Sequence, residues 1–262
     1  MSQHAVAGSE LEIALDYHTY RSQFGLAEDV MPRVSYNSAL DALTTFMQRP
    51  GYRQYLRNKL RDQITDIGEN LLRRTGYNQE MWVRIVYRRE WQDFLAALPL
   101  KSLAALEISP GGLPVLNESS VAYYRAVSFP GFDVTQEALS EQFDIIIAEH
   151  VFEHLRHPYR AAHNVYKMLR DGGVFLFATP FLIKIHGHPQ DYTRWTPDGV
   201  SGFLEDCGFT ADVHCWGNRK AVKANFASWS HYGWRRDLRN EAEFPASVWA
   251  YARKQVQRVG AT

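Results

Sequence analysis

The spacing of apolar positions changes near residue 102. Before it, apolar residues recur every three or four positions and are followed by Pro or Gly, which predicts amphipathic helices. We expect three such helices, over residues 40–47, 56–71 and 81–95, after an irregular segment at 1–36. We therefore interpret residues 1–100 as a mainly helical N-terminal appendage that helps to cover a site.

From residue 102 onward, short apolar runs alternate with helix-like segments, which is typical of an α/β domain. Strands are predicted at residues 103–108, 121–127, 143–148, 174–178, 209–216 and 246–252. Interleaved helices imply a mostly parallel sheet, Rossmann-like, with helices on both faces. The interval between the second strand and Phe143 is too short for a helix, a strand and another helix, so we expect this part of the domain, 101–262, to be shortened.

Residues 143–180 read as strand, helix and strand, which is a right-handed crossover unit. We expect Gly172 and Gly173 to end the helix and Pro180 to end the second strand. A polar cluster follows the first strand: Glu149, His150, Glu153 and His154. Open α/β sheets bind ligands at the carboxyl ends of their strands, so this cluster is a candidate site.

Composition narrows the classes of partner. Lys and Arg balance Asp and Glu to a net charge of +0, which argues against nucleic-acid binding, because such proteins carry a basic excess. Two cysteines, Cys207 and Cys215, make no disulfide framework and fit a cytoplasmic location. We expect neither a signal-peptide core nor a membrane span. Homo-oligomerisation stays open.

The motifs carry a resemblance to a known family. The resemblance rests on FDIIIAEHVFEHL, a helix ending in MLRDGG, a strand running into TP, and DYTRWTPDGVSGFLEDCGF. The chain resembles the class I S-adenosylmethionine-dependent methyltransferases, and most of all their small-molecule, type 11-like branch. The likeness covers residues 102–256 and is most specific over 143–209. It implies S-adenosylmethionine as the cofactor and transfer of its methyl group to an oxygen or nitrogen.

The resemblance implies a cofactor-binding turn at Leu106-Glu-Ile-Ser-Pro-Gly-Gly-Leu113. Glu107 and Gly111 match the family's acidic residue and second glycine, and Gly112 adds backbone freedom. Ser109 stands where the first glycine is usual, and Leu113 where the third is. An ordinary turn after a strand is the alternative interpretation.

Three further residues are implied for the cofactor. The family's second strand normally ends in a carboxylate for the ribose diol, but Tyr123-Tyr-Arg-Ala-Val127 has none, so Asp133 is the nearest candidate. A turn carboxylate that bonds its own backbone is the alternative for Asp133. Glu149 and His150 would face the sulfonium, or else form a solvated strand end.

The loop at residues 181–195 is the candidate acceptor site, and we weigh three interpretations of it. A histidine, His186 or His188 (with His154 beside the helix start), takes a proton from the acceptor. Alternatively, His-x-His with Asp191 binds a metal, which we disfavour because no fourth ligand is evident, so we expect none. In the third, Asp191 and Arg194 form a structural clasp. Tyr192 and Arg194 are our candidate substrate-binding residues.

The aromatic stretch at residues 225–235 either walls a substrate pocket or packs as core. Together these features predict an enzyme that methylates a small molecule, such as a sugar or a natural-product intermediate. Two rivals remain. One is a methyltransferase-like scaffold without turnover, suggested by the altered glycine turn and the missing ribose acid. The other is a nucleic-acid methyltransferase that uses the basic helices at 59–74.

Overall fold

The computed structural model describes residues 71–72, 74–110, 114–116, 118–187, 190–234 and 236–255. The irregular segment and the first two helices expected for the appendage lie outside these residues, apart from a helical end at positions 71, 72 and 74. Contacts divide the chain into two compact units, 1–75 and 76–262. Only the second is described below. Within the described residues, no helix has the length and apolar character to cross a membrane.

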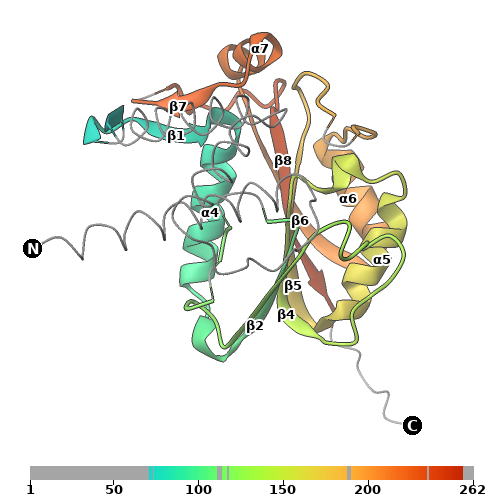
Figure 1. The fold of residues 1–262 in the computed structure, drawn as a ribbon. Coiled ribbons are helices and arrows are strands. Elements are labelled where there is room, and N and C mark those ends of the chain that lie inside the picture. Colours follow the sequence, from blue (N-terminus) through green and yellow to red (C-terminus); the bar gives the residue numbers. More distant parts are fainter. Residues whose placement is uncertain are drawn as a thin grey trace, which may run out of the picture. The chain divides into compact units, whose positions relative to one another are not determined.

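The second unit is built from a sheet with helices on both faces (Figure 1). Its strands are β1 (Asn78–Met81), β2 (Ala104–Ile108), β3 (Tyr123–Val127), β4 (Phe143–Glu149), β5 (Leu169–Pro180), β6 (Phe209–Trp216), β7 (His231–Gly233) and β8 (Ser247–Lys254). Its α-helices are α4 (Ile85–Ala96), α5 (Pro158–Met168), α6 (Pro197–Asp206) and α7 (Arg219–Ala227). Short 3-10 helices are η1 (Trp82–Arg84), η2 (Leu100–Ser102) and η3 (Phe152–His154).

The main sheet has six strands in the order β3-β2-β4-β5-β8-β6. The first four pair in parallel, whereas β8 runs antiparallel to both of its neighbours. This topology confirms the predicted mostly parallel α/β fold. The described residues 128–142 form no strand between β3 and β4, so the predicted shortening is also confirmed.

Alternate residues of β4 pack into two different cores. Ile146 and Ala148 face α5 and α6, whereas Ile145 and Ile147 face α4. All four side chains are almost fully buried. Burial on both faces explains why the strand reads as an unbroken apolar run, and each buried isoleucine stabilises the fold by roughly 1.5–3 kcal/mol.

Helix α4, expected as the third helix of the appendage, packs directly on the sheet. Tyr87 and Trp91 are fully buried in the same core as Ile145. The indole of Trp249 on β8 donates a hydrogen bond to Glu90 of α4 at 3.1 Å. Residues 76–100 therefore belong to the compact unit of the sheet, and the unit boundary lies at 75/76 instead of 100.

The expectation that Gly172 and Gly173 end the crossover helix is wrong. Helix α5 ends at Met168, and both glycines lie inside β5, next to a register shift where it pairs with β4. Gly172 has φ +79°, a conformation that favours glycine. A Cβ on Gly173 would lie 2.9 Å from the Arg170 carbonyl oxygen and 3.0 Å from that of Asp144. The glycine pair serves a bulge between close-packed strands.

The end of the 181–195 loop is fixed by a helix cap. Thr196 precedes α6, and its hydroxyl accepts a hydrogen bond from the Gly199 amide at 3.1 Å. Pro197 occupies the first helical position, where its missing N–H costs nothing. The predicted start of this helix is confirmed.

Candidate functional site

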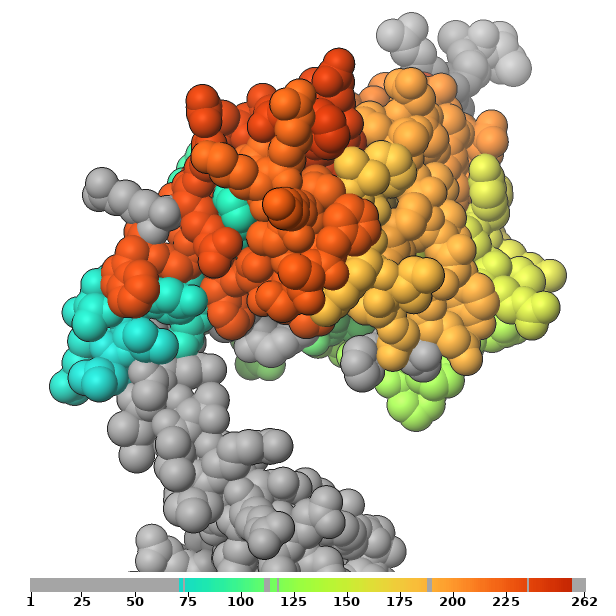
Figure 2. Space-filling view, turned by 90° about the horizontal axis from the view of Figure 1, so that it is seen from above, coloured from blue at the N-terminus to red at the C-terminus, as the bar shows by residue number. Residues whose placement is uncertain are grey.

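The carboxyl ends of two neighbouring parallel strands, β2 and β4, form the edge where a site is expected. The residue after each strand is left-handed, since Ser109 has φ +51° and His150 has φ +54°. The Ser109 amide donates to the Val127 carbonyl at 2.7 Å, and that of His150 to Ala178 at 2.9 Å. Both turns are thus tied to adjacent strands. Figure 2, a view from above, shows gold and orange segments of the later chain over much of this face of the molecule.

Glu107 of β2 is almost completely buried. Its carboxylate accepts hydrogen bonds from the Val115 amide at 3.0 Å and from the Tyr124 hydroxyl at 2.9 Å. Burial raises the pKa of Glu107 above its usual value, although these donors oppose the shift. The residue therefore organises the turn after β2. Gly111, Gly112 and Leu113 of that turn lie outside the described residues.

Asp133 sits in the short connection between β3 and β4. One of its oxygens accepts hydrogen bonds from the Thr135 amide at 2.9 Å and the Thr135 hydroxyl at 2.7 Å. This is the turn geometry that we gave as the alternative to a ribose contact. A cofactor role for Asp133 remains a prediction.

Glu149, at the end of β4, is held by α4 and the residue before it. Its carboxylate accepts hydrogen bonds from the Tyr87 hydroxyl at 2.6 Å, from Arg88 Nε at 2.7 Å and from Arg84 at 3.3 Å. Burial opposes its ionisation, but the Arg88 hydrogen bond and the charges of both arginines hold the pKa of Glu149 below its usual value. This carboxylate is ionised and fixed in place.

The three partners of Glu149 were missed from the sequence. Arg84 directly precedes α4 and Arg88 lies one helical turn later, on either side of Tyr87. The nearby residues Ile85, Tyr87 and Trp91 of this helix are buried in the core. Charged residues within such a core-facing stripe were the signal that could have found them. Two further buried atoms here, Arg84 Nε and His150 Nε2, have no hydrogen-bond partner in the part of the chain that the structure describes.

Glu153 of η3 lies at the centre of a cluster of imidazoles. Its side chain is 0% exposed, and neither of its oxygens has a hydrogen-bond partner among the residues that the structure describes. The Glu153 Oε1 atom is 3.6 Å from His150 Nδ1, 3.6 Å from His154 Nε2 and 3.9 Å from His186 Nε2. Burial raises the pKa of Glu153 to about 8.

Two of these imidazoles are oriented by partners on their other nitrogen. His154 Nδ1 contacts the Gln190 carbonyl oxygen, and His186 Nδ1 is 3.2 Å from the Asp191 carboxylate. Asp191 in turn accepts hydrogen bonds from Arg194, as the clasp interpretation predicted, and from the His186 amide at 2.9 Å. Burial lowers the pKa of His186, although Asp191 opposes this shift.

The 181–195 loop folds back onto η3. The Tyr192 amide donates to the Glu153 carbonyl at 2.7 Å, while the Tyr192 side chain is exposed and its hydroxyl donates to Gln190 at 2.6 Å. Trp229, from the aromatic stretch, meets His186 edge-on, with 5.3 Å between ring centroids. One aromatic ring of that stretch therefore borders the cluster. His188 lies outside the described residues.

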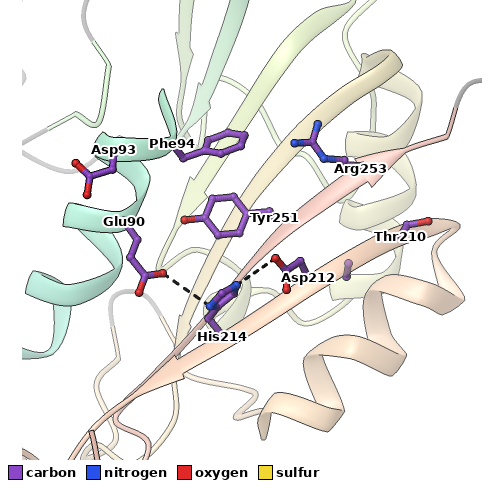
Figure 3. Close-up of a pocket in the computed structure, with 9 residues that line it drawn as sticks. Glu90, Asp93, Phe94, Thr210, Asp212, His214, Tyr251 and Arg253 are labelled. Atoms are coloured by element: carbon purple, nitrogen blue, oxygen red, sulfur yellow. Dashed lines mark ion pairs between the residues drawn. The ribbon is translucent and has the colours of Figure 1, made fainter. Parts of the chain in front are cut away.

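A separate pocket of about 440 Å³ lies between α4 and the strands β6 and β8 (Figure 3). His214 stands inside it, with Nδ1 3.9 Å from Glu90 and Nε2 3.2 Å from Asp212. Tyr251 and Arg253 of β8 also line it, together with Asp93 and Phe94 of α4 and Thr210 and Ala211 of β6. This pocket contains none of the residues that the sequence assigned to a site.

A comparison with protein families decides the identity. A family profile described as "Methyltransferase domain" matches residues 69–219, more than half of the chain. The chain belongs to this methyltransferase family. The protein is therefore an S-adenosylmethionine-dependent methyltransferase, as the resemblance implied. The match begins at residue 69 and so includes α4 with its arginines.

Solved structures give a weaker likeness. The chain is 17% identical to an S-adenosylmethionine-dependent methyltransferase of Mesorhizobium loti (TM-score 0.41, covering 63% of this chain and 97% of that one). It is 15% identical to the N-methyltransferase NodS of Bradyrhizobium japonicum (TM-score 0.40, covering 64% of this chain and 97% of that one). It is 9% identical to the phosphoethanolamine N-methyltransferase 2 of Haemonchus contortus, in complex with S-adenosylmethionine (TM-score 0.43, covering 63% of this chain and 53% of that one). No curated protein sequence matches the chain. With TM-scores below 0.5, these structures add nothing to the family assignment.

The residues at the β2–β4 edge fit the amino-acid end of the methyltransferase cofactor. Arg84 Nε and His150 Nε2 are buried and have no hydrogen-bond partner among the described residues, so they can hydrogen-bond a carboxylate, and Glu107 holds the Val115 amide beyond the end of β2. The residues of this edge offer fewer partners for the ribose of the cofactor, because no residue of β3 is acidic. Of the parts of the cofactor, its charged end is therefore the one that the residues of this edge fit best.

Proposed function

We propose that the methyltransferase acts on an oxygen or nitrogen atom of a small molecule held beside Glu153, His154 and His186. The observation that carries this proposal is the convergence of these three proton-binding side chains, whose ligand atoms lie within 4.8 Å of one another. They follow β4 and β5 at the sheet edge where α/β folds bind ligands. The cofactor, when bound, supplies an electrophilic methyl group on a sulfonium.

The protein's own contribution is alignment, exclusion of water and removal of one proton. Methyl transfer forms a bond from the acceptor atom to the methyl carbon, breaks the carbon–sulfur bond, and releases the acceptor's proton. A side chain whose pKa lies near neutrality is suited to accept that proton, and the pKa of Glu153 is raised to about 8. The partly exposed imidazoles of His154 and His186 lie between Glu153 and the surface.

The acceptor side is bordered by the 181–195 loop. The exposed Tyr192 ring and Trp229 offer apolar faces, and Arg194 stays fixed by Asp191. The neutral net charge supports a small acceptor over a nucleic acid. Tyr192 is thus proposed as an acceptor contact, and Arg194 as the residue that keeps the loop in place.

Titration calorimetry with S-adenosylmethionine and its demethylated product tests the cofactor half of the proposal. We expect a Kd on the order of micromolar and at least tenfold weaker binding by Glu107→Gln, which disturbs the turn after β2. Lack of binding to a folded protein would instead favour the scaffold without turnover. One observation favours that rival, since Glu149 and Asp133 are both engaged by protein groups.

The acceptor half is tested with methyl-labelled cofactor offered to separate small-molecule, protein and RNA fractions of a cell extract. Label in the small-molecule fraction supports the proposal. Label that enters only RNA or protein contradicts it, whatever the cofactor affinity.

A further inference from the structure

We infer that Glu153, His154 and His186 form a binding site for one divalent transition-metal cation. Their ligand atoms, one carboxylate oxygen and two imidazole nitrogens, lie within 4.8 Å of one another. Two imidazoles and one carboxylate suit Zn²⁺, Mn²⁺, Co²⁺ and Fe²⁺. This set differs from the His-x-His and Asp191 ligands considered from the sequence, because Asp191 binds the far nitrogen of His186.

The first support is the state of the Glu153 carboxylate. It is completely buried, and both of its oxygens lack a hydrogen-bond partner in the described part of the chain. Its ion-pair partners among the described residues are imidazoles alone, since Arg84 and Arg88 pair with Glu149. A buried carboxylate without a donor is costly unless a proton or a cation neutralises it.

The second support, independent of the first, is the orientation of the two histidines. In each ring Nδ1 faces an oxygen atom, the Gln190 carbonyl for His154 and the Asp191 carboxylate at 3.2 Å for His186, and Arg194 lies farther from His186 Nδ1, at 3.4 Å. An Nδ1–H that donates to these oxygens leaves a lone pair on Nε2, and both Nε2 atoms face Glu153. Such contacts on the far nitrogen are what orients histidine ligands in metal sites.

Three lone-pair atoms that point at one another repel unless something positive lies between them. The distances from Glu153 Oε1 to the two Nε2 atoms, 3.6 and 3.9 Å, are too long for a shared proton. Metal bonds of about 2.0–2.2 Å place ligand atoms roughly 3.0–3.5 Å apart, so small side-chain movements suffice to close the site.

His150 is the fourth group at this point. Its Nδ1 atom is 3.6 Å from the same Glu153 oxygen, but its ring is stacked on Tyr87 and is buried. Three ligands leave coordination positions open towards the partly exposed side of His154 and His186. A cation there can bind water or an acceptor oxygen and lower its pKa. This role rests on the proposed function and replaces Glu153 as the proton acceptor, because a carboxylate bound to a cation does not also take up the proton. The binding of the cation does not rest on that function.

The test uses the full-length protein, freed of any affinity tag and stripped with EDTA. Equilibrium dialysis against Co²⁺, Mn²⁺ or Zn²⁺, followed by elemental analysis, measures stoichiometry, and the visible absorption of Co²⁺ reports its ligands. We expect one cation per chain. Glu153→Gln and His186→Ala should weaken binding at least a hundredfold, and Asp191→Asn, which acts through His186, ten- to a hundredfold.

The matched control is His163→Ala, which removes an exposed histidine of α5 whose Nδ1 contacts the Tyr159 carbonyl oxygen one turn earlier in the same helix. It should bind the cation as the wild type does. Circular dichroism without metal checks each fold, and His154→Ala replaces any variant that does not fold. The inference is overturned if the wild-type protein takes up no cation. It is also overturned if Glu153→Gln and His186→Ala bind the cation as tightly as the wild type does.

The titrations need neither cofactor nor acceptor, so they fail independently of the proposed function. Cation binding without methyl transfer keeps the metal site and removes the role given to it. Methyl transfer that is unchanged in the EDTA-stripped protein keeps the proposed function and removes the role given to the cation, whereas a failure to take up any cation overturns the site.

Discussion

The hydroxyl of Tyr87 donates a 2.6 Å hydrogen bond to the carboxylate of Glu149, which joins α4 to the end of β4. Both side chains are buried, and burial raises the pKa of Tyr87 well above its usual value, so the phenol stays a donor. A segment that reads as an appendage in the sequence thus fixes the strand end at the proposed cofactor site.

Tyr87→Phe tests that junction. The ring and its packing remain, while a hydrogen bond to a buried charge is lost, so the free energy of unfolding should fall by about 1.5–3 kcal/mol. Urea unfolding measures it. Tyr159→Phe, at an exposed ring on α5, is the control and should change stability by less than about 0.5 kcal/mol. Equal effects of the two variants would mean that the Tyr87 hydroxyl is not a structural donor.

Glu149→Gln should show a pH-dependent cost. Because the pKa of Glu149 is lowered in the folded protein, its stabilisation is present above the unfolded value near 4.5 and disappears as the pH falls through the folded value. At pH 7 the variant should be less stable by about 3 kcal/mol, since Arg84 and Arg88 lose their counter-charge.

Thermal melts of wild type and Glu149→Gln from pH 7 to pH 3 check this prediction. The difference between them should shrink as the pH drops below about 4.5. A difference that is constant over this range would show that the ionised carboxylate contributes nothing beyond its shape.

Gly173→Ala should destabilise the protein by about 1–3 kcal/mol. The new Cβ would meet backbone oxygens at 2.9 and 3.0 Å, from Arg170 and Asp144, and backbone cannot move aside cheaply. Gly202→Ala in α6 is the matched control, because nothing lies within 4 Å of its Cβ position. There alanine should stabilise the helix by about 0.5–1 kcal/mol. The same sign of change at both positions in chemical denaturation would contradict the bulge interpretation of β5.

Local signals in the sequence were sufficient for the sheet and for α6. Alternating apolar runs located every strand of the parallel part, and Thr196-Pro197 marked a helix start that the structure confirms. The prediction that Gly172 and Gly173 end a helix was wrong, because glycines can either stop a helix or permit a bulge in a strand. Only the pairing of β5 with β4 decides between these two outcomes.

The candidate site was predictable only in part, because its partners are far apart in the chain. Glu149 was placed at a strand end from its local pattern, but the side chains that hold it come from 61 to 65 residues earlier. His154 and His186 were chosen separately as bases. That their Nε2 atoms meet at Glu153 depends on the fold of the 181–195 loop, which no periodicity encodes.

Arg84→Gln should weaken binding of S-adenosylmethionine at least tenfold, about 1.4 kcal/mol, because the buried Arg84 Nε is a donor with no partner among the described residues at the charged end of the proposed site. Calorimetric titration measures this, with Arg89→Gln, at an exposed arginine of α4, as the control. Decarboxylated S-adenosylmethionine makes the test specific. If Arg84 binds the cofactor's carboxylate, wild type and Arg84→Gln should bind this analogue alike, since the group that distinguishes them is gone. A loss that persists with the analogue would mean that Arg84 acts only by supporting Glu149.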